Sequence, residues 1–113
     1  MPARNAPTEM IMRLFEVRAK PGCVPILLEK FATTSADVVQ NAPGHEGYFF
    51  GDEVSSDDDR VIFASLWTNL EAVQARFGAS WRESFLPAGY EDLIEACSIR
   101  HIRVGRGWFP RSQ

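Results

Sequence analysis

The sequence of 113 residues has few cysteines, no excess of positive charge and no long apolar run. Its two cysteines, Cys23 and Cys97, form no Cys-x-x-Cys pair and join no histidine cluster, so we expect free thiols and no metal site. The net charge of −3 argues against nucleic-acid or anionic-membrane binding, because both need a basic surface. No stretch of about 18 apolar residues is present, so we expect no membrane-spanning helix.

Motifs that mark several common enzyme classes are also missing. The sequence has no glycine-rich phosphate-binding loop, no nucleophile elbow and no dinucleotide-binding fingerprint. Residues 1–9 lack the apolar core of a secretory signal, and we expect them to be a disordered lead-in to a cytoplasmic protein. We expect a single domain over residues 10–104 and a C-terminal tail over residues 105–113.

Four segments have the pattern of strands. Residues 10–19, 47–54, 60–67 and 96–104 contain alternating apolar residues or clustered aromatic ones. A polar stretch, SSDDD, separates the second from the third, so we expect these two strands to form a hairpin.

Two segments have the pattern of helices. The first begins near Pro25, and the stretch NAPG ends it before residue 45. Its buried face is formed by residues at helical spacing, namely Leu27, Leu28, Phe31, Ser35, Val38 and Val39. The second opens with a T-x-x-E capping box, in which Thr68 is the N-cap and Glu71 lies at N3.

The order strand, helix, strand, strand, helix, strand predicts an α+β fold of the ferredoxin-like type. Two helices then cover one face of an antiparallel sheet, and the other face needs a partner. The strand residues that we expect to be too apolar for water are Phe15, Val17, Tyr48, Phe50, Phe63 and Trp67. A second copy of the chain is the simplest cover, so we predict a homodimer with facing sheets.

Several motifs taken in order resemble the antibiotic biosynthesis monooxygenase family. They are KPG after the first strand, APG after the first helix, GHEGYFFGDEV, VIFASLW, and W-x-x-L-E-A at the second helix. The resemblance covers about residues 10–104 and implies a dimeric α+β barrel with a pocket between sheet and helices in each subunit. Some members oxidise aromatic polyketides or quinols with O₂ and no metal or flavin, whereas others degrade haem. The resemblance therefore implies a fold more firmly than a reaction.

The haem-degrading branch is similar in three positions that can be compared with this chain. That branch has an Asn on the first strand, a Trp ending the third strand and a His ten residues later. Here Trp67 matches, but Phe77 stands at the His position and Phe15 lies near the Asn position. Phenylalanine has no lone pair to offer iron, so we expect neither haem degradation nor a cofactor.

Two residues are candidates for catalysis. Trp67 either stacks on a flat aromatic substrate or fills the core at a strand end. His101 either removes a phenolic proton, which leaves an electron-rich anion for O₂ to oxidise, or is a half-exposed strand residue. His45 lies in a turn, and we expect it to be solvated surface.

Seven residues are candidates for substrate binding. Either arginine among them would bind an anionic or carbonyl oxygen, or would pair with a carboxylate at the sheet rim. Tyr48 would donate a hydrogen bond to the substrate or pack with its hydroxyl at the surface. The full set is Arg13, Phe15, Tyr48, Phe50, Phe63, Phe77 and Arg103.

These observations favour a cofactor-independent monooxygenase-like enzyme that acts on a small apolar or aromatic molecule. The alternatives are a dimer that binds a small molecule without catalysis and a structural dimer whose own side chains fill the barrel. The volume of the pocket separates the structural dimer from the other two, because a filled barrel admits no substrate.

Overall fold

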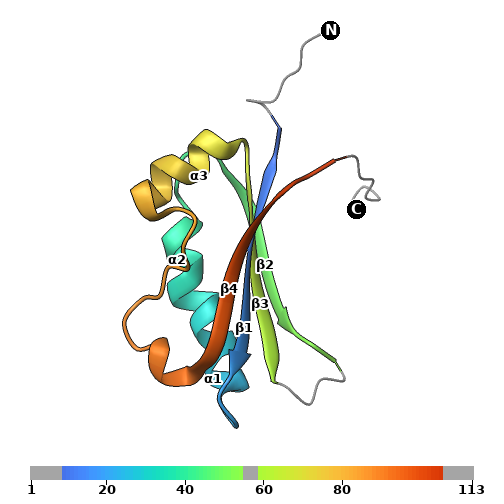
Figure 1. Ribbon diagram of the computed structural model, residues 1–113, viewed down its shortest axis with the longest axis vertical. Helices are drawn as coiled ribbons and strands as arrows, with labels where there is room; N and C mark the ends of the chain where they lie inside the picture. Colours follow the sequence, from blue (N-terminus) through green and yellow to red (C-terminus); the bar gives the residue numbers. More distant parts are fainter. Residues whose placement is uncertain (1–8, 55–58, 106–113) are drawn as a thin grey trace, which may run out of the picture.

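A computed structural model describes residues 9–54 and 59–105 (Figure 1). Its four strands, β1 (Ile11–Ala19), β2 (His45–Asp52), β3 (Arg60–Trp67) and β4 (Ile94–Arg103), form one antiparallel sheet in the order β2-β3-β1-β4. This order places the first and last strands side by side and confirms the predicted ferredoxin-like fold. Most of the lead-in predicted over residues 1–9, of the loop over 55–59 and of the tail over 105–113 lies outside the described residues, which omit 1–8, 55–58 and 106–113.

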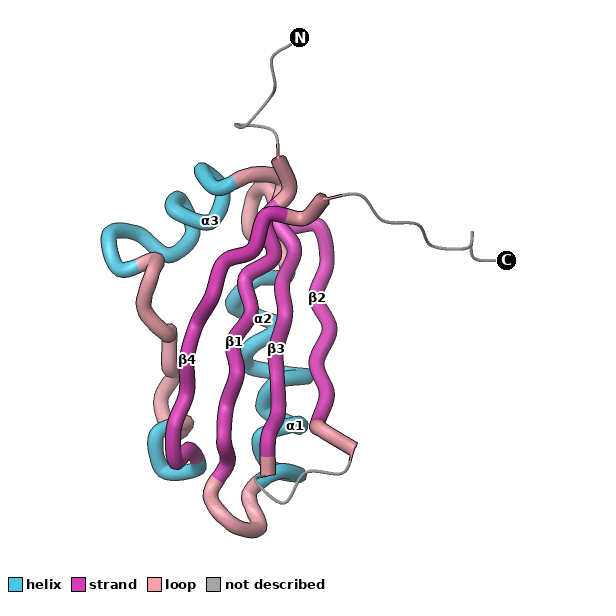
Figure 2. Tube along the Cα trace, turned by 45° about the vertical axis from the view of Figure 1, so that its right-hand side comes forward, coloured by secondary structure: helices cyan, strands magenta, loops and turns pink. Residues whose placement is uncertain are grey.

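The helices lie together on one face of the sheet (Figures 1 and 2). The first helical segment consists of α1 (Val24–Lys30), the π-helical turn η2 (Phe31–Ser35) and α2 (Ala36–Val39), where the sequence predicts one regular helix. A π turn is wider than an α turn, and such turns are common at functional sites. Among the described residues, no helix is long and apolar enough to span a membrane.

The second helix starts one residue later than the capping box predicts. Helix α3 (Leu70–Phe77) has Asn69 as its N-cap, and the Asn69 side-chain oxygen accepts from the Ala72 N–H at 2.9 Å. The Thr68 hydroxyl instead contacts the carboxylate of Glu46 at 2.7 Å and the Gly44 carbonyl at 3.1 Å. The N-cap is therefore Asn69 and not the predicted Thr68, because asparagine caps helices at least as well as threonine.

Two short 3₁₀ turns frame the rest of the helical side. The turn η3 (Gly78–Ser80) follows α3, and η4 (Glu91–Leu93) leads into β4. Residues 82–90 connect them without a helix or strand and run past the covered face of the sheet. This connection supplies part of the wall of the cavity described below.

The helix-covered face of the sheet contains the aromatic residues for which the sequence predicts a partner. Phe15 pairs with Phe63 across β1 and β3, and Phe50 pairs with Phe63 across β2 and β3, so the three side chains share one face. Phe31 from η2 is fully buried above them, with ring centroids 5.5–6.2 Å from theirs. The prediction that these residues need a partner chain is wrong, because the helices already cover them. The sequence pattern does not fix which sheet face meets the helices.

The opposite face of the sheet is open and carries a different apolar set. Alternate residues point to opposite faces of a strand, so this side receives Met12, Leu14, Phe49, Ile62, Leu66 and Ile102. Phe49 is 50% exposed and Ile102 is 39% exposed. No part of the described chain packs over this face (Figure 2).

Candidate functional site

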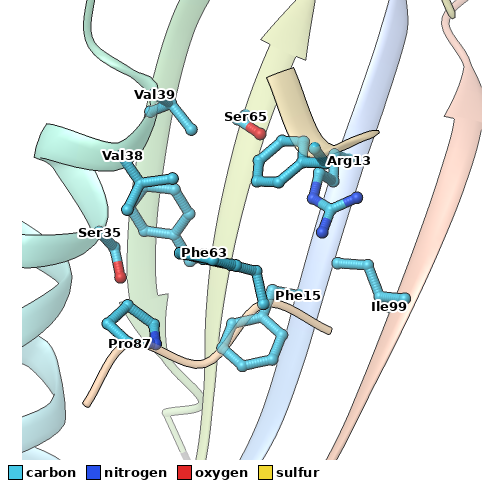
Figure 3. A pocket seen from close by; sticks show the side chains of 11 residues that line it. Arg13, Phe15, Ser35, Val38, Val39, Phe63, Ser65, Pro87 and Ile99 are labelled. Atoms are coloured by element: carbon cyan, nitrogen blue, oxygen red, sulfur yellow. The ribbon is translucent and has the colours of Figure 1, made fainter. Parts of the chain in front are cut away.

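A small cavity of about 40 Å³ lies between the sheet and the helical layer (Figure 3). Its wall combines strand residues with residues of the first helical segment, α3 and the connection before β4. The lining residues are Arg13, Phe15, Ser35, Val38, Val39, Phe63, Ser65, Phe77, Phe85, Pro87 and Ile99. The space holds a few water molecules, whereas sites for drug-sized ligands occupy roughly 300 Å³ or more.

Four of the predicted site residues, Arg13, Phe15, Phe63 and Phe77, line this cavity. Tyr48 and Phe50 do not line it, and each stacks on Phe63 from the neighbouring strand, with centroids 5.5 and 6.4 Å apart. They therefore support the wall from behind.

Arg103, at the end of β4, also lies outside the cavity lining. Its Nε atom is 3.3 Å from the Glu9 carboxylate, and its side chain is 77% exposed. Of the two predicted arginines, only Arg13 therefore reaches the cavity.

Arg13 is the charged residue of the cavity, and it is only 5% exposed. Its Nη1 group donates to the Trp81 carbonyl at 2.5 Å and contacts His101 Nε2 at 2.9 Å, and Nη2 donates to the Glu83 carbonyl at 3.1 Å. The guanidinium carbon also lies 3.8 Å from the centre of the Phe77 ring, a cation–π contact. These contacts hold the guanidinium in one position against the cavity.

No carboxylate neutralises this cation within the described residues. The ion pairs found there join Arg100 to Glu16 and Arg103 to Glu9. Burial and then the nearby positive charge of Arg76 lower the pKa of Arg13 to about 10, which leaves it charged at neutral pH. The Arg76 guanidinium lies 5.2 Å from the Phe77 ring on which Arg13 also packs. The cavity is therefore positive in a chain whose net charge is −3.

His101 faces the same side of the sheet, directly opposite Arg13 in the register of β1 and β4. Arginine has no hydrogen-bond acceptor, so Nε2 of His101 must accept from Arg13 and the ring proton must be on Nδ1. Burial, followed by the charges of Arg13 and Arg82, lowers the pKa of His101 to about 4. At neutral pH His101 is thus an uncharged acceptor for Arg13, and its Nε2 lone pair is already in use.

Trp67 is fully buried and does not line the cavity. Its indole N–H donates to Ser65 Oγ at 2.8 Å, and its ring meets Phe77 edge-on with centroids 5.8 Å apart. Trp67 therefore contacts two residues of the cavity wall, Ser65 and Phe77, and is not part of the wall itself.

His45 also contacts Trp67, with ring centroids 5.2 Å apart, and its Nε2 atom is buried without a hydrogen-bond partner. The sequence prediction of a solvated His45 is wrong. The irregular pairing between β2 and β3 near residues 45–47 brings its ring over the covered face of the sheet.

The two serines of the cavity wall, Ser65 and Ser35, are not among the predicted site residues, although Ser35 is predicted on the buried face of the first helix. Ser65 interrupts the apolar strand RVIFASLW at an inward-facing position. A polar residue in such a strand is the sequence feature that points to Ser65. Ser35 is at the end of the π-helical turn, and a π turn cannot be anticipated from helical spacing alone.

The lining residues do not fit a haem group. None of them carries an imidazole, thiolate, thioether or phenol, which are the usual iron ligands. The described residues also contain no group of three or more His, Cys, Asp or Glu side chains that could hold a metal ion. Cys23 and Cys97 are both free thiols.

The fold and the cavity define a class of protein: a ferredoxin-like α+β domain with an apolar, cationic pocket between sheet and helices. The chain belongs to the antibiotic biosynthesis monooxygenase family, whose model matches residues 10–81. No curated protein matches the sequence.

Solved structures with the same fold include proteins of different activities. A haem-degrading protein from Mycobacterium tuberculosis is 23% identical, with 88% of this chain and 99% of that chain covered and a TM-score of 0.65. SnoaB, a cofactor-independent oxygenase from Streptomyces nogalater, is 14% identical, with 91% and 99% covered and a TM-score of 0.64. A protein from Shewanella oneidensis is 14% identical, with 86% and 92% covered and a TM-score of 0.67. At these identities the likeness shows the fold alone.

Proposed function

We propose that the protein is a cofactor-independent, monooxygenase-like enzyme that acts on a small aromatic molecule bearing an ionised oxygen. The observation that carries the proposal is Arg13, a buried cation in an apolar cavity without a carboxylate partner among the described residues. An unpaired buried charge costs several kcal/mol, so such a residue calls for an anionic ligand. Family membership, and an oxygenase among the structures of the same fold, support the reaction type.

The substrate would arrive already ionised. His101 is a weak base at neutral pH because its pKa is about 4, and its Nε2 lone pair accepts from Arg13. His101 is not part of the cavity lining, and the lining residues carry no general base. A substrate whose hydroxyl ionises readily would bind Arg13 as the oxyanion and would need no proton transfer to the protein.

The proposed reaction converts a ring CH₂ group, attached to the aromatic system that bears the oxyanion, into a ketone. The substrate supplies all four electrons that reduce O₂. One oxygen atom forms the new C=O bond, and the other leaves as water with the two hydrogens released from carbon. Arg13 would stabilise the negative charge on the substrate oxygen, and the apolar wall would exclude bulk water.

Binding would require the cavity to widen, because its volume of about 40 Å³ is smaller than an aromatic substrate. Phe85 and Pro87 belong to residues 82–90, which have no helix or strand, and Phe85 is 48% exposed. Displacing the Phe85 and Pro87 side chains would open the cavity without disturbing the sheet.

Oxygen consumption tests the proposal directly. The purified protein is incubated with a panel of hydroxyanthrones, which carry the CH₂ group, and O₂ uptake is followed against the rate with heat-denatured protein. We expect uptake above the uncatalysed rate with at least one substrate, and loss of that increment in Arg13→Met. Equal rates with native and denatured protein across the panel would contradict the proposal.

A second candidate, a small-molecule binder without turnover, is favoured by the lack of a free general base in the lining. It predicts saturable binding of aromatic oxyanions to the same cavity and no O₂ uptake. Haem titration adds a third comparison, because a haem-degrading protein has the same fold. From the donor set of the cavity we expect no axially ligated haem spectrum.

We also propose that the protein is a homodimer joined through its open sheet face. Six apolar side chains gather there, and Phe49 and Ile102 are substantially exposed. Facing sheets would bury both copies of this patch, as expected for a symmetric interface.

A further inference from the structure

The hydroxyl of Ser65 has a feature that the proposed function does not use. Ser65 is 2% exposed, lines the cavity, and accepts a hydrogen bond from Trp67 Nε1–H at 2.8 Å. A serine hydroxyl also has one hydrogen to donate, and no described residue accepts it. A buried donor without an acceptor is destabilising, so the position favours an acceptor that enters the cavity.

Arg13 offers free donors at the same place. Three of its five N–H groups are used by the Trp81 carbonyl, the Glu83 carbonyl and His101 Nε2, which leaves two. Ser65 is the residue directly opposite Arg13 in the register of β1 and β3. Opposed residues on one sheet face have Cβ atoms about 5 Å apart, so both side chains reach the same end of the cavity (Figure 3).

The two serines of the cavity differ in how their hydroxyls are used. Ser35 Oγ lies 2.7 Å from Tyr90 Oη, and Tyr90 donates its own hydrogen to the Lys30 carbonyl at 3.1 Å. The Ser35 hydrogen therefore goes to Tyr90, and only its lone pairs are left for a ligand. Thus the Arg13 end of the cavity donates hydrogen bonds, whereas the Ser35 end can only accept them.

We propose that Ser65 and Arg13 form a two-donor subsite for one substrate oxyanion, and that Trp67 is a positioning residue for the Ser65 hydroxyl. The indole N–H occupies a lone pair of Ser65 Oγ and leaves its hydrogen directed away from Trp67, towards the cavity. Trp67 then acts on the oxyanion through the hydroxyl of Ser65, whereas its contact with Phe77 is one of packing. The inference rests on the proposed function, because it assumes that the cavity takes an oxyanion.

Calorimetric binding tests the subsite with two oxyanions, benzoate and 4-nitrophenolate, and their neutral counterparts, benzamide and nitrobenzene. A hydrogen bond to a charged group is worth about 1.5–3 kcal/mol, so we expect Ser65→Ala to weaken oxyanion binding about 10- to 100-fold. Binding of the neutral compounds should change little. The matched control is Ser35→Ala, at the accepting end of the same cavity, which should retain the preference for the oxyanions. A response from benzoate alone or from 4-nitrophenolate alone identifies the class of oxyanion that the subsite accepts.

Trp67→Phe tests the positioning role, because it removes the indole N–H and keeps an aromatic ring. We expect weaker oxyanion binding when Ser65 is present and no further loss in the Ser65→Ala background. A loss in both backgrounds would show that Trp67 merely supports the fold, and would overturn its positioning role. Circular dichroism checks folding, and the indole N–H signal in NMR should shift in Ser65→Ala and stay in place in Ser35→Ala, whatever the ligand.

The failures of the two proposals are distinguishable. If Ser65→Ala binds oxyanions like the wild type while Arg13→Met does not, the two-donor subsite is wrong and the cationic cavity stands. If the wild type shows no preference for oxyanions, both the subsite and the proposed role of Arg13 are overturned.

Discussion

The two faces of the sheet treat a strand arginine in opposite ways. On the open face, Arg100 has a side chain that is 58% exposed and pairs with Glu16 at 2.6 Å. On the covered face, Arg13 is 5% exposed and contacts two carbonyls, a neutral histidine and an aromatic ring. The exposed ion pair is an ordinary surface feature, whereas a buried cation without a counter-ion is expensive. In the proposed function, Arg13 on the covered face receives a negative charge from the substrate, and Arg100 on the open face has no such role.

The open face also carries exposed apolar residues, and we expect the largest effect from replacing one of them with a charged residue. Phe49→Glu places a charge on the open face, and we expect a dimer to become a monomer. Ile26 on α1 is the matched control, because it is 48% exposed against 50% for Phe49 and lies among the helices. Ile26→Glu should keep the mass of the wild type in light scattering. A wild-type protein that is monomeric at micromolar concentration would contradict the dimer.

The covered face should depend on Phe31 for its stability. The ring is fully buried and meets Phe15, Phe50 and Phe63 edge-on. Phe31→Ala should lower the free energy of unfolding by about 3–5 kcal/mol in urea denaturation. Phe85→Ala is the comparison in the cavity wall, and its 48% exposed side chain should matter far less. Equal losses would mean that the Phe85 side chain is as firmly packed as the core.

His101 should make the stability of the protein depend on pH. Its pKa is about 4 in the folded protein against 6.5 for an unperturbed histidine, so the unfolded chain binds a proton first as the pH falls. Stability contributed by neutral His101 is complete above pH 6.5, decreases as the pH falls towards 4, and decreases no further below it. His101→Gln keeps an acceptor for Arg13 and should lose less stability over this range.

His45 provides the control for that experiment, because burial also lowers its pKa. Denaturation midpoints of the wild type, His101→Gln and His45→Gln are compared across the pH range. If the denaturation midpoints of His101→Gln and the wild type change in parallel with pH, the contact with Arg13 does not control the protonation of His101.

The smallest effect is expected at the ion pair of the open face. In the monomeric Phe49→Glu background, Arg100→Gln should change the free energy of unfolding by at most about 1 kcal/mol, because both partners are solvated there. High salt should abolish even this difference. A larger loss that persists in salt would contradict the description of Arg100 and Glu16 as a solvent-exposed ion pair.

Much of this architecture is predictable from the sequence, and the exceptions have physical causes. The strand over residues 60–67 is predicted at its exact bounds, because an apolar run ends where a cap begins. The cap moved from Thr68 to Asn69, since both residue types cap helices and differ by one position. The predicted position of the helices relative to the sheet is wrong, because the alternation of side chains along a strand identifies two faces without saying which one the helices cover.

The candidate site was only partly predictable for a related reason. Arg13, Phe63 and Phe77 were identified from their residue types, and all three line the cavity. The contacts that decide their chemistry are long-range: His101 accepts from Arg13 across 88 positions of the chain. Ser65 belongs to no catalytic motif. Its proposed role depends on contacts with Trp67, two residues away, and on Arg13 in the neighbouring strand.

The proposed function depends on whether Arg13 recognises a negative charge. The most direct measurement compares benzoate with benzamide by calorimetry in the wild type, Arg13→Met and Arg100→Met. The wild type and Arg100→Met should prefer benzoate, and Arg13→Met should bind the two compounds equally weakly. An Arg13→Met protein that still prefers benzoate would contradict the central claim.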